Sequence, residues 1–356
     1  MYAYSHGGNA AFENGKEGII DLSANINPLG MPESVKSAIV REISNCACYP
    51  DSFSTKLRKK IAENEAINPA WIFCGNGASD IIFRIPRAIQ AKKAAVTAPA
   101  FSDYERSARS SGSEVIRYTL PADNDFALNN DFIEYIRREK PNLAFICNPN
   151  NPTGCLTESG LIEELLDCCQ RTGAWVAIDE CFLDFSEQAE KYTGKGFLER
   201  YSNLVIIKAF TKLFALPGIR LGYAISSNKA LIDSLYFHGA DWPVSNLAQA
   251  AGIAALHDAD SFIKKTKDYV SAERTAIEKE LTRLGFKVFK SNANYVFLKN
   301  PYPFDLSDEL DKKGIRIRSC GNYHGLDGSY CRIAVSAKEN NEKLLTAIRD
   351  IINERT

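Results

Sequence analysis

The sequence predicts an α/β fold, with a large domain built on a mostly parallel sheet between helices and a smaller α+β domain beside it. From about residue 70 to 240, short apolar runs alternate with amphipathic stretches, which is the pattern of βαβ units. The last hundred or so residues differ: a long helical pattern precedes several strand-like pieces. We therefore expect an N-terminal arm and part of the small domain at 1–44, the large domain at 45–240 and the remaining small domain at 241–356.

Five apolar runs are the expected strands of the large domain. They lie at 93–101, 142–149, 174–180, 203–208 and 220–226. Between the second and third, "TESGLIEELLDCCQRTG" carries apolar side chains at helical spacing, and Gly173 is placed to end that helix. Strands alternating with helices pair in parallel through right-handed crossovers. Functional residues of such sheets collect in loops beyond the carboxyl ends of the strands.

The C-terminal region predicts the small domain. A long helical pattern, "SFIKKTKDYVSAERTAIEKELTRLG", closes at Gly285. The pieces "FKVFKS" and "NYVFLK" alternate as strands do, and a helix "DLSDELDKKG", another strand pair and a terminal helix follow.

Composition is ordinary for a soluble globular protein and argues against several other classes. Of 356 residues, 45% are hydrophobic and 24% are charged, with a net charge of −1. No basic block or aromatic-basic stripe indicates nucleic acid. Neither a signal peptide nor an apolar stretch of ~18 residues is present, so we expect a cytoplasmic protein without a membrane span. The 10 cysteines form no C-x-x-C pair, which favours reduced structural thiols and no metal site.

Lys212 is the first candidate for chemistry, because it follows a strand and stands between Thr211 and Leu213 in an apolar turn. Its ammonium group could reach solvent along its methylene stem. Alternatively, desolvation lowers its pKa and makes it a reactive amine for Schiff-base formation.

Other polar residues follow neighbouring strands. Gly75 and Gly77 form a turn before Ser79, where a helix start could hold a phosphate, although such turns alone are weak signals. Asn151 stands in the rigid segment "CNPNNPTG". Asp179 ends an apolar run, as a paired structural carboxylate or as the partner of a protonated heterocyclic nitrogen.

Arg220 adds a second phosphate ligand, and the set as a whole describes a pyridoxal 5'-phosphate site. Lys212 would carry the aldehyde, and Asp179 would keep the pyridine nitrogen protonated. The glycine turn, the serine and the arginine would hold the phosphate.

Seven motifs, in order along nearly the full chain, make the sequence resemble the fold type I pyridoxal-phosphate enzymes, in the branch that holds histidinol-phosphate aminotransferase and threonine-phosphate decarboxylase. They are "NINPLG", "YPD", "GNGASD", "NPNNPTG", "DECFLDF", "FTKLFALPGIRLGY" and "RIAVS". Two positions depart from the family pattern: Phe182 replaces a common tyrosine, and Ala209 replaces a common serine of the phosphate site.

The resemblance implies a role for each matching residue. The ring would be stacked by Phe101, and Asn151 and Asp179 would bind its phenolic oxygen and its nitrogen. Tyr49 would reach the cofactor phosphate of a neighbouring subunit, which implies an obligate homodimer. Arg332 would grip the substrate carboxylate. The cofactor phosphate would be held by Gly77, Ala78, Ser79, Thr211 and Arg220.

The N-terminal "SHGGNAAFENG" and "IDLSANINPLG" resemble the decarboxylase side of this branch. The resemblance then makes His6, Asn27 and Arg318 candidates for the substrate phosphate, with Arg318 and Arg332 on adjacent strands. Without it, His6 reads as a flexible tail and the arginines as surface ion pairs.

The expected function is a lyase of cobalamin biosynthesis, which decarboxylates L-threonine O-3-phosphate to (R)-1-aminopropan-2-ol O-phosphate. Alternatives are an L-serine O-phosphate decarboxylase and a histidinol-phosphate aminotransferase. A cofactor-binding protein without catalysis is disfavoured by Lys212, Asp179 and Arg220. A Rossmann dehydrogenase is disfavoured because no G-x-G-x-x-G follows the first strand.

Overall fold

The computed structural model describes residues 7, 8 and 18–355. A seven-stranded sheet forms its centre, in the order β2-β8-β7-β6-β5-β3-β4. Strands β3 to β7 pair in parallel, whereas β8 is antiparallel to both its neighbours. The strands are β2 (Ile72–Gly75), β3 (Lys93–Ala98), β4 (Glu114–Thr119), β5 (Leu143–Cys147), β6 (Trp175–Asp179), β7 (Leu204–Ala209) and β8 (Gly222–Ile225).

The five strands expected from apolar runs are thus confirmed as β3, β5, β6, β7 and β8. The edge strand β4, which is not fully buried at any position, was not foreseen because it carries no apolar run. The mostly parallel sheet is confirmed as well.

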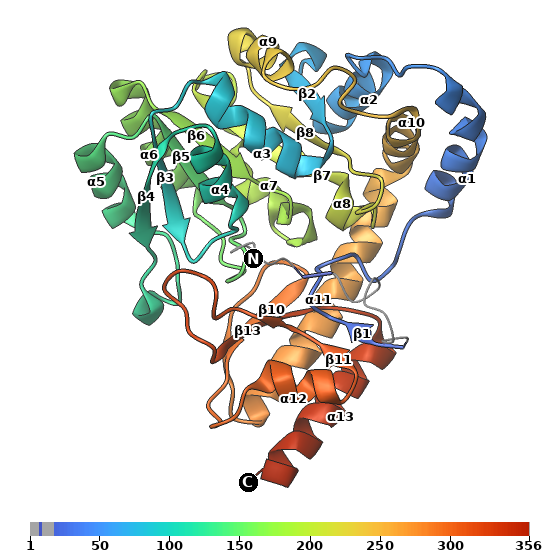
Figure 1. The fold of residues 1–356 in the computed structure, drawn as a ribbon, viewed down its shortest axis with the longest axis vertical. Helices are drawn as coiled ribbons and strands as arrows, with labels where there is room; N and C mark the ends of the chain where they lie inside the picture. The colour runs from blue at the N-terminus through green and yellow to red at the C-terminus, as the bar shows by residue number, and fades with distance from the viewer. Residues whose placement is uncertain (1–6, 9–17, 356) are drawn as a thin grey trace.

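Helices cover both faces of this sheet (Figure 1). Along β6, Val176 and Ile178 enter one buried cluster and Ala177 enters the other, as the two-residue period of a strand requires. Helices α2, α5, α6 and α10 contribute to the first cluster and α3, α4 and α9 to the second. Their bounds are α1 (Glu33–Glu42), α2 (Thr55–Glu65), α3 (Gly77–Ala88), α4 (Asp103–Ser110), α5 (Asn130–Glu139), α6 (Ser159–Thr172), α7 (Ala189–Tyr192), α8 (Phe210–Leu213), α9 (Lys229–Phe237) and α10 (Asn246–Ala255).

A smaller α+β unit lies below the sheet in Figure 1. Its four-stranded sheet has the order β12-β13-β10-β9, and a two-stranded parallel pair joins β1 to β11. Helix α11 runs between the two units, with Val270 in a large-domain cluster and Ile277 in the small-domain cluster. The elements are β1 (Ile20–Asp21), α11 (Ala259–Arg283), β9 (Lys287–Phe289), β10 (Tyr295–Lys299), α12 (Leu306–Lys312), β11 (Ile315–Arg316), β12 (Arg318–Ser319), β13 (Tyr330–Ala334) and α13 (Lys338–Arg355).

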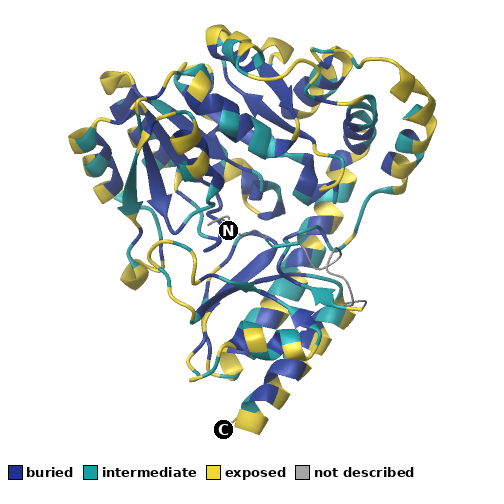
Figure 2. Cartoon of the chain, in the orientation of Figure 1, coloured by how far each residue is buried: buried dark blue, intermediate teal, exposed yellow. Residues whose placement is uncertain are grey.

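An aromatic cluster joins the two units. Phe126, from the loop after β4, places its ring 5.4 Å from that of Phe289, 5.7 Å from Phe297 and 5.8 Å from Tyr330. Figure 2 shows the central strands and the small-domain sheet as dark, buried ribbon, with exposed residues on the outer helix faces. Over residues 18–355, no helix combines the length and the apolar character that a bilayer span needs.

Candidate active site

Residues from several strand ends line one cavity of about 170 Å³ between the two units. The contributing segments follow β3, β5, β6 and β7, and the first turn of α3 and two strands of the small domain complete the wall. Of the residues predicted from the sequence, the cavity is lined by Ala78, Ser79, Phe101, Asn151, Asp179, Thr211, Lys212, Arg220, Arg318 and Arg332.

Lys212 lies on α8, the short helix directly after β7, and its side chain is half-buried. Burial lowers the pKa of this amine to about 8, and the nearby guanidinium groups of Arg332 and Arg220 act in the same direction. The thiol of Cys181 and the carboxylate of Asp179 oppose the shift without cancelling it. The uncharged, nucleophilic form of Lys212 is therefore far more populated near neutral pH than that of an ordinary lysine.

Asp179 ends β6 and is 5% exposed. Its carboxylate accepts a hydrogen bond from the Tyr104 hydroxyl at 2.6 Å and another from the Cys181 N–H at 2.9 Å. Burial raises the pKa of Asp179, although these two hydrogen bonds favour the charged form. A cationic partner in the cavity would restore the charged carboxylate, as a protonated heterocyclic nitrogen does.

The first turn of α3 forms an anion-binding corner with Arg220. Gly77 has a φ of +80°, and a Cβ atom at this position would lie 2.7 Å from Nη2 of Arg220. Glycine therefore lets the guanidinium lie against the start of the helix, beside Ala78 and Ser79. The first N–H groups of a helix have no intrahelical acceptor, so together with the guanidinium they suit a phosphate.

The opposite end of the cavity holds buried polar groups that lack partners. Arg332 is 6% exposed and donates through Nη2 to the Ser23 carbonyl at 2.8 Å and through Nη1 to Asn151. Its Nε, and both amide atoms of Asn25, make no hydrogen bond within the described part of the chain. Such groups are costly unless a ligand satisfies them. Arg318 stands opposite Arg332 in the β12–β13 register, which confirms that the two arginines lie on adjacent strands.

Three predicted residues that the structure describes, Gly77, Asn27 and Tyr49, are not among those that line the cavity. The Asn27 amide instead donates to the Leu213 carbonyl at 2.6 Å and to the Thr266 hydroxyl at 2.8 Å, so its side chain is committed to the wall behind Lys212. Tyr49 is 80% exposed and stacks on Trp242 at 4.4 Å, away from the cavity of its own chain. His6 lies outside the described residues.

The lining residues that sequence reasoning missed include Asn25, Tyr104 and Tyr323. Asn25 belongs to the same "NINPLG" motif as Asn27, and the motif itself was the available signal. Tyr104 has no signal in its own neighbourhood, because its partner Asp179 is 75 residues away.

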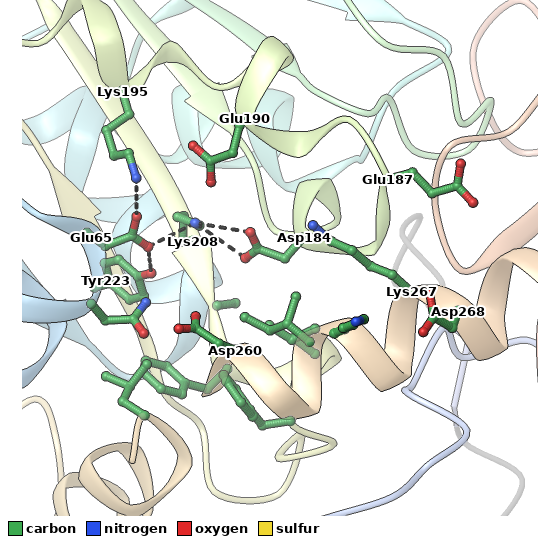
Figure 3. A pocket seen from close by; sticks show the side chains of 18 residues that line it. Glu65, Asp184, Glu187, Glu190, Lys195, Lys208, Tyr223, Asp260, Lys267 and Asp268 are labelled. Atoms are coloured by element: carbon green, nitrogen blue, oxygen red, sulfur yellow. Dashed lines mark hydrogen bonds and ion pairs between the residues drawn. The ribbon is translucent and has the colours of Figure 1, made fainter. Parts of the chain in front are cut away.

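A second cavity, of about 480 Å³, lies beside the first and shares the α8 helix with it. Phe210 and Leu213 of α8 line the second cavity, whereas Thr211 and Lys212 line the first. Figure 3 shows Lys208 in this second cavity, between the carboxylates of Glu65 and Asp184.

The fold and the first cavity define a pyridoxal-phosphate-dependent enzyme, because a lysine of lowered pKa, a buried aspartate and an anion corner converge there. The unpartnered buried groups of Asn25 and Arg332 fit a charged substrate bound beside that cofactor.

Comparison with known proteins agrees with this class. The profile of the family described as "Aminotransferase class I and II" matches residues 17–351. Threonine-phosphate decarboxylase of Salmonella typhimurium is 33% identical over 99% of this chain and 98% of its own length. Histidinol-phosphate aminotransferase of Caldanaerobacter subterraneus is 31% identical over 93% of each chain. The crystal structure of the histidinol-phosphate aminotransferase from Clostridium acetobutylicum superposes with a TM-score of 0.88 at 32% identity, covering 94% of this chain and 100% of that one.

The chain belongs to the aminotransferase class I and II family. Its fold is the fold type I architecture of pyridoxal-phosphate enzymes, and its cofactor is pyridoxal 5'-phosphate.

Proposed function

We propose that this protein decarboxylates L-threonine O-3-phosphate to (R)-1-aminopropan-2-ol O-phosphate, a step that supplies the cobalamin nucleotide loop. The observation that carries the proposal is the polar end of the cavity, where the adjacent arginines Arg318 and Arg332 accompany the unpartnered amide of Asn25. A substrate with both a carboxylate and a phosphate satisfies such an end. The similarity to a threonine-phosphate decarboxylase over 99% of the chain supports the same choice.

Separate residues of the chain would hold the cofactor and transfer the proton in this reaction. Pyridoxal phosphate, when bound, withdraws the electron pair that the breaking Cα–carboxylate bond releases. Asp179 would keep the ring nitrogen protonated, and the corner formed by the start of α3 with Arg220 would hold the cofactor phosphate. Once carbon dioxide has left, Lys212 would deliver a proton to Cα, since an amine with a pKa of about 8 can act as a general acid at neutral pH.

Substrate orientation would decide between decarboxylation and transamination, because it determines which bond to Cα is presented for cleavage when the cofactor is bound. We propose that Arg332 sets this orientation through the substrate carboxylate. Phe182 supports decarboxylation over transamination, because it lines the cavity at a position where many family aminotransferases carry a tyrosine hydroxyl.

The test is a product assay on cofactor-loaded protein with threonine phosphate, serine phosphate and histidinol phosphate, each with and without 2-oxoglutarate. Carbon dioxide released from threonine phosphate without the keto acid is the expected result, and Lys212→Ala is the inactive control. Carbon dioxide released mainly from serine phosphate would identify serine phosphate, and not threonine phosphate, as the substrate. Glutamate formed from histidinol phosphate, and only with 2-oxoglutarate, would replace the proposal by an aminotransferase.

We also propose a homodimer in which Tyr49 serves the partner's site. Tyr49 and Trp242 are both exposed and stack with ring centroids 4.4 Å apart, and exposed aromatic side chains are enriched at protein interfaces. Mixing Tyr49→Ala subunits with Lys212→Ala subunits tests this, because a hybrid dimer rebuilds one complete site. Recovery of activity on mixing is expected, and additive, unrestored activities would contradict a site shared between subunits.

A further inference from the structure

Ser23 lies where the small-domain strands, the substrate end of the cavity and the described residues of the N-terminal arm meet. The preceding residue, Leu22, donates to the Arg316 carbonyl at 2.7 Å and accepts from the Ala334 N–H at 2.8 Å. Leu22 is fully buried, so this segment is fixed between β11 and β13, and β13 is the strand that carries Arg332.

The Ser23 side chain holds the arm. Its Oγ donates to Asp21 Oδ1 at 2.6 Å, and the Ser23 N–H donates to the same oxygen at 2.9 Å. With its proton directed at Asp21, the hydroxyl oxygen accepts the Gly8 N–H at 3.0 Å. Ser23 is 3% exposed, which removes water as a competitor for these bonds.

The Ser23 main chain holds Arg332, because the Ser23 carbonyl accepts from Arg332 Nη2 at 2.8 Å. Gly7 lies directly against that carbonyl: a Cβ atom at position 7 would lie 2.4 Å from the oxygen. Only glycine allows the arm to approach this closely. Gly7 and Ser23 both line the cavity, so this described part of the arm lies at its substrate end.

We propose that Ser23 is a positioning residue that seats the arm through Gly8 and aims Arg332 through its carbonyl, and thereby sets the affinity for phosphorylated substrates. The proposal deepens the proposed function and rests on it. One buried residue fixes two substrate-facing parts of the chain in relation to each other, so loss of either contact weakens substrate binding more than the chemical step.

The experiment compares the kcat and KM of Ser23→Ala, Gly7→Ala and the double variant for O-phospho-L-threonine, together with the inhibition constant of O-phosphoethanolamine. Ser23→Ala is expected to raise KM and the inhibition constant about 3- to 10-fold, the effect of one lost hydrogen bond, with kcat within about twofold. Gly7→Ala places a Cβ atom against the Ser23 carbonyl and so displaces residue 7, while the Ser23 hydroxyl is retained. Both changes disturb the same contact between residues 7 and 8 and Ser23. The increase in KM of the double variant should therefore equal the larger of the two single increases and not their product.

Ser226→Ala is the matched control, since Ser226 is equally buried and its Oγ donates to the Leu204 carbonyl at 2.7 Å. It should leave KM unchanged. Bound cofactor, measured by absorbance, should be the same in all variants. A lower cofactor content with unchanged KM in Ser23→Ala, or multiplying effects in the double variant, would overturn the proposal. Failure of the proposed function would appear separately, as wild-type protein that releases no carbon dioxide.

Discussion

Two lysines four positions apart, Lys208 and Lys212, lie in opposite electrostatic surroundings. Lys208, on β7, is 9% exposed, and its Nζ lies 2.9 Å from Glu65 and 3.3 Å from Asp184 (Figure 3). Burial alone would lower the pKa of Lys208, but the carboxylates of Asp184 and Glu65 raise it well above its ordinary value. The pKa of Lys212 moves the other way, to about 8, through burial and neighbouring arginines.

The difference shows that burial does not by itself make a lysine reactive. The surrounding carboxylates keep the Lys208 amine charged, so that it anchors them in a buried ion-pair network. The Tyr223 hydroxyl joins this network by donating a hydrogen bond to Glu65 at 2.5 Å. Surrounding guanidinium groups leave the other amine ready to lose its proton. The strand and the following helical turn therefore place one lysine in each of two adjoining cavities.

The largest effect should come from removing the reactive lysine. Lys212→Ala should lower kcat by about 10³-fold or more, because the chain loses both its nucleophile and its proton donor at Cα. Carbon dioxide release measures the loss, and the absorbance of bound cofactor should shift because no imine to the chain forms. Lys229→Ala, at an exposed lysine paired with Asp233, is the control. A Lys212→Ala enzyme within tenfold of wild type would refute the assignment.

Lys208→Met should act on stability instead. It leaves the Glu65 carboxylate buried without its nearest cation, which costs about 3–5 kcal/mol of unfolding free energy. Denaturant unfolding of the cofactor-free protein measures this cost. The double variant Glu65→Gln with Lys208→Met should recover much of the loss. A cost below about 1 kcal/mol would mean that the pair is not an anchor.

The pH dependence of cofactor loading separates the two amines. Only the unprotonated amine attacks the aldehyde, so the loading rate of cofactor-free protein should rise with pH and level off above a midpoint near 8. At pH 7 about one-tenth of Lys212 is unprotonated, against about one in three thousand for an ordinary lysine. Rapid-mixing absorbance follows the rate. A midpoint above pH 10 would place Lys212 in the same class as Lys208.

The smallest expected effect is a shift in the pH midpoint of cofactor loading when a neighbouring arginine is removed. Arg332→Gln removes one of the charges that lower the pKa of Lys212, so the loading midpoint should move upward by less than about one pH unit. Arg318→Gln is the matched control: it also alters a cavity arginine, whereas Arg332 is the arginine that lowers the pKa of Lys212 most. An unchanged or lower midpoint in Arg332→Gln would contradict a contribution of Arg332 and leave burial and Arg220 as the causes of the lowered pKa.

Much of this arrangement could be predicted from the sequence, because it depends on local pattern. Apolar runs located β5, β6 and β7, and polar residues immediately after such runs located Asn151, Asp179 and Lys212. A strand end fixes where the next few residues lie, so residues that follow parallel strands converge without further information.

What could not be predicted depends on distant partners. Whether Asn25 or Asn27 faces the cavity depends on Leu213 and Thr266. The Asn27 amide donates to both of them, whereas the Asn25 amide has no such partner and lines the cavity. Likewise Lys208 differs from Lys212 because of Glu65, which lies 143 residues earlier on α2. No local pattern records such contacts.

The Phe126 cluster limits how this chain can be recombined with its relatives. Phe126 precedes the small-domain sheet by more than 150 residues, yet its ring completes the aromatic surface of Phe289, Phe297 and Tyr330. A chimaera joined only near residue 240 would pair one parent's loop with the other parent's aromatic pocket. The segment that must be exchanged is therefore discontinuous in sequence: a small domain taken from a relative must be transferred together with that relative's counterpart of the loop around Phe126.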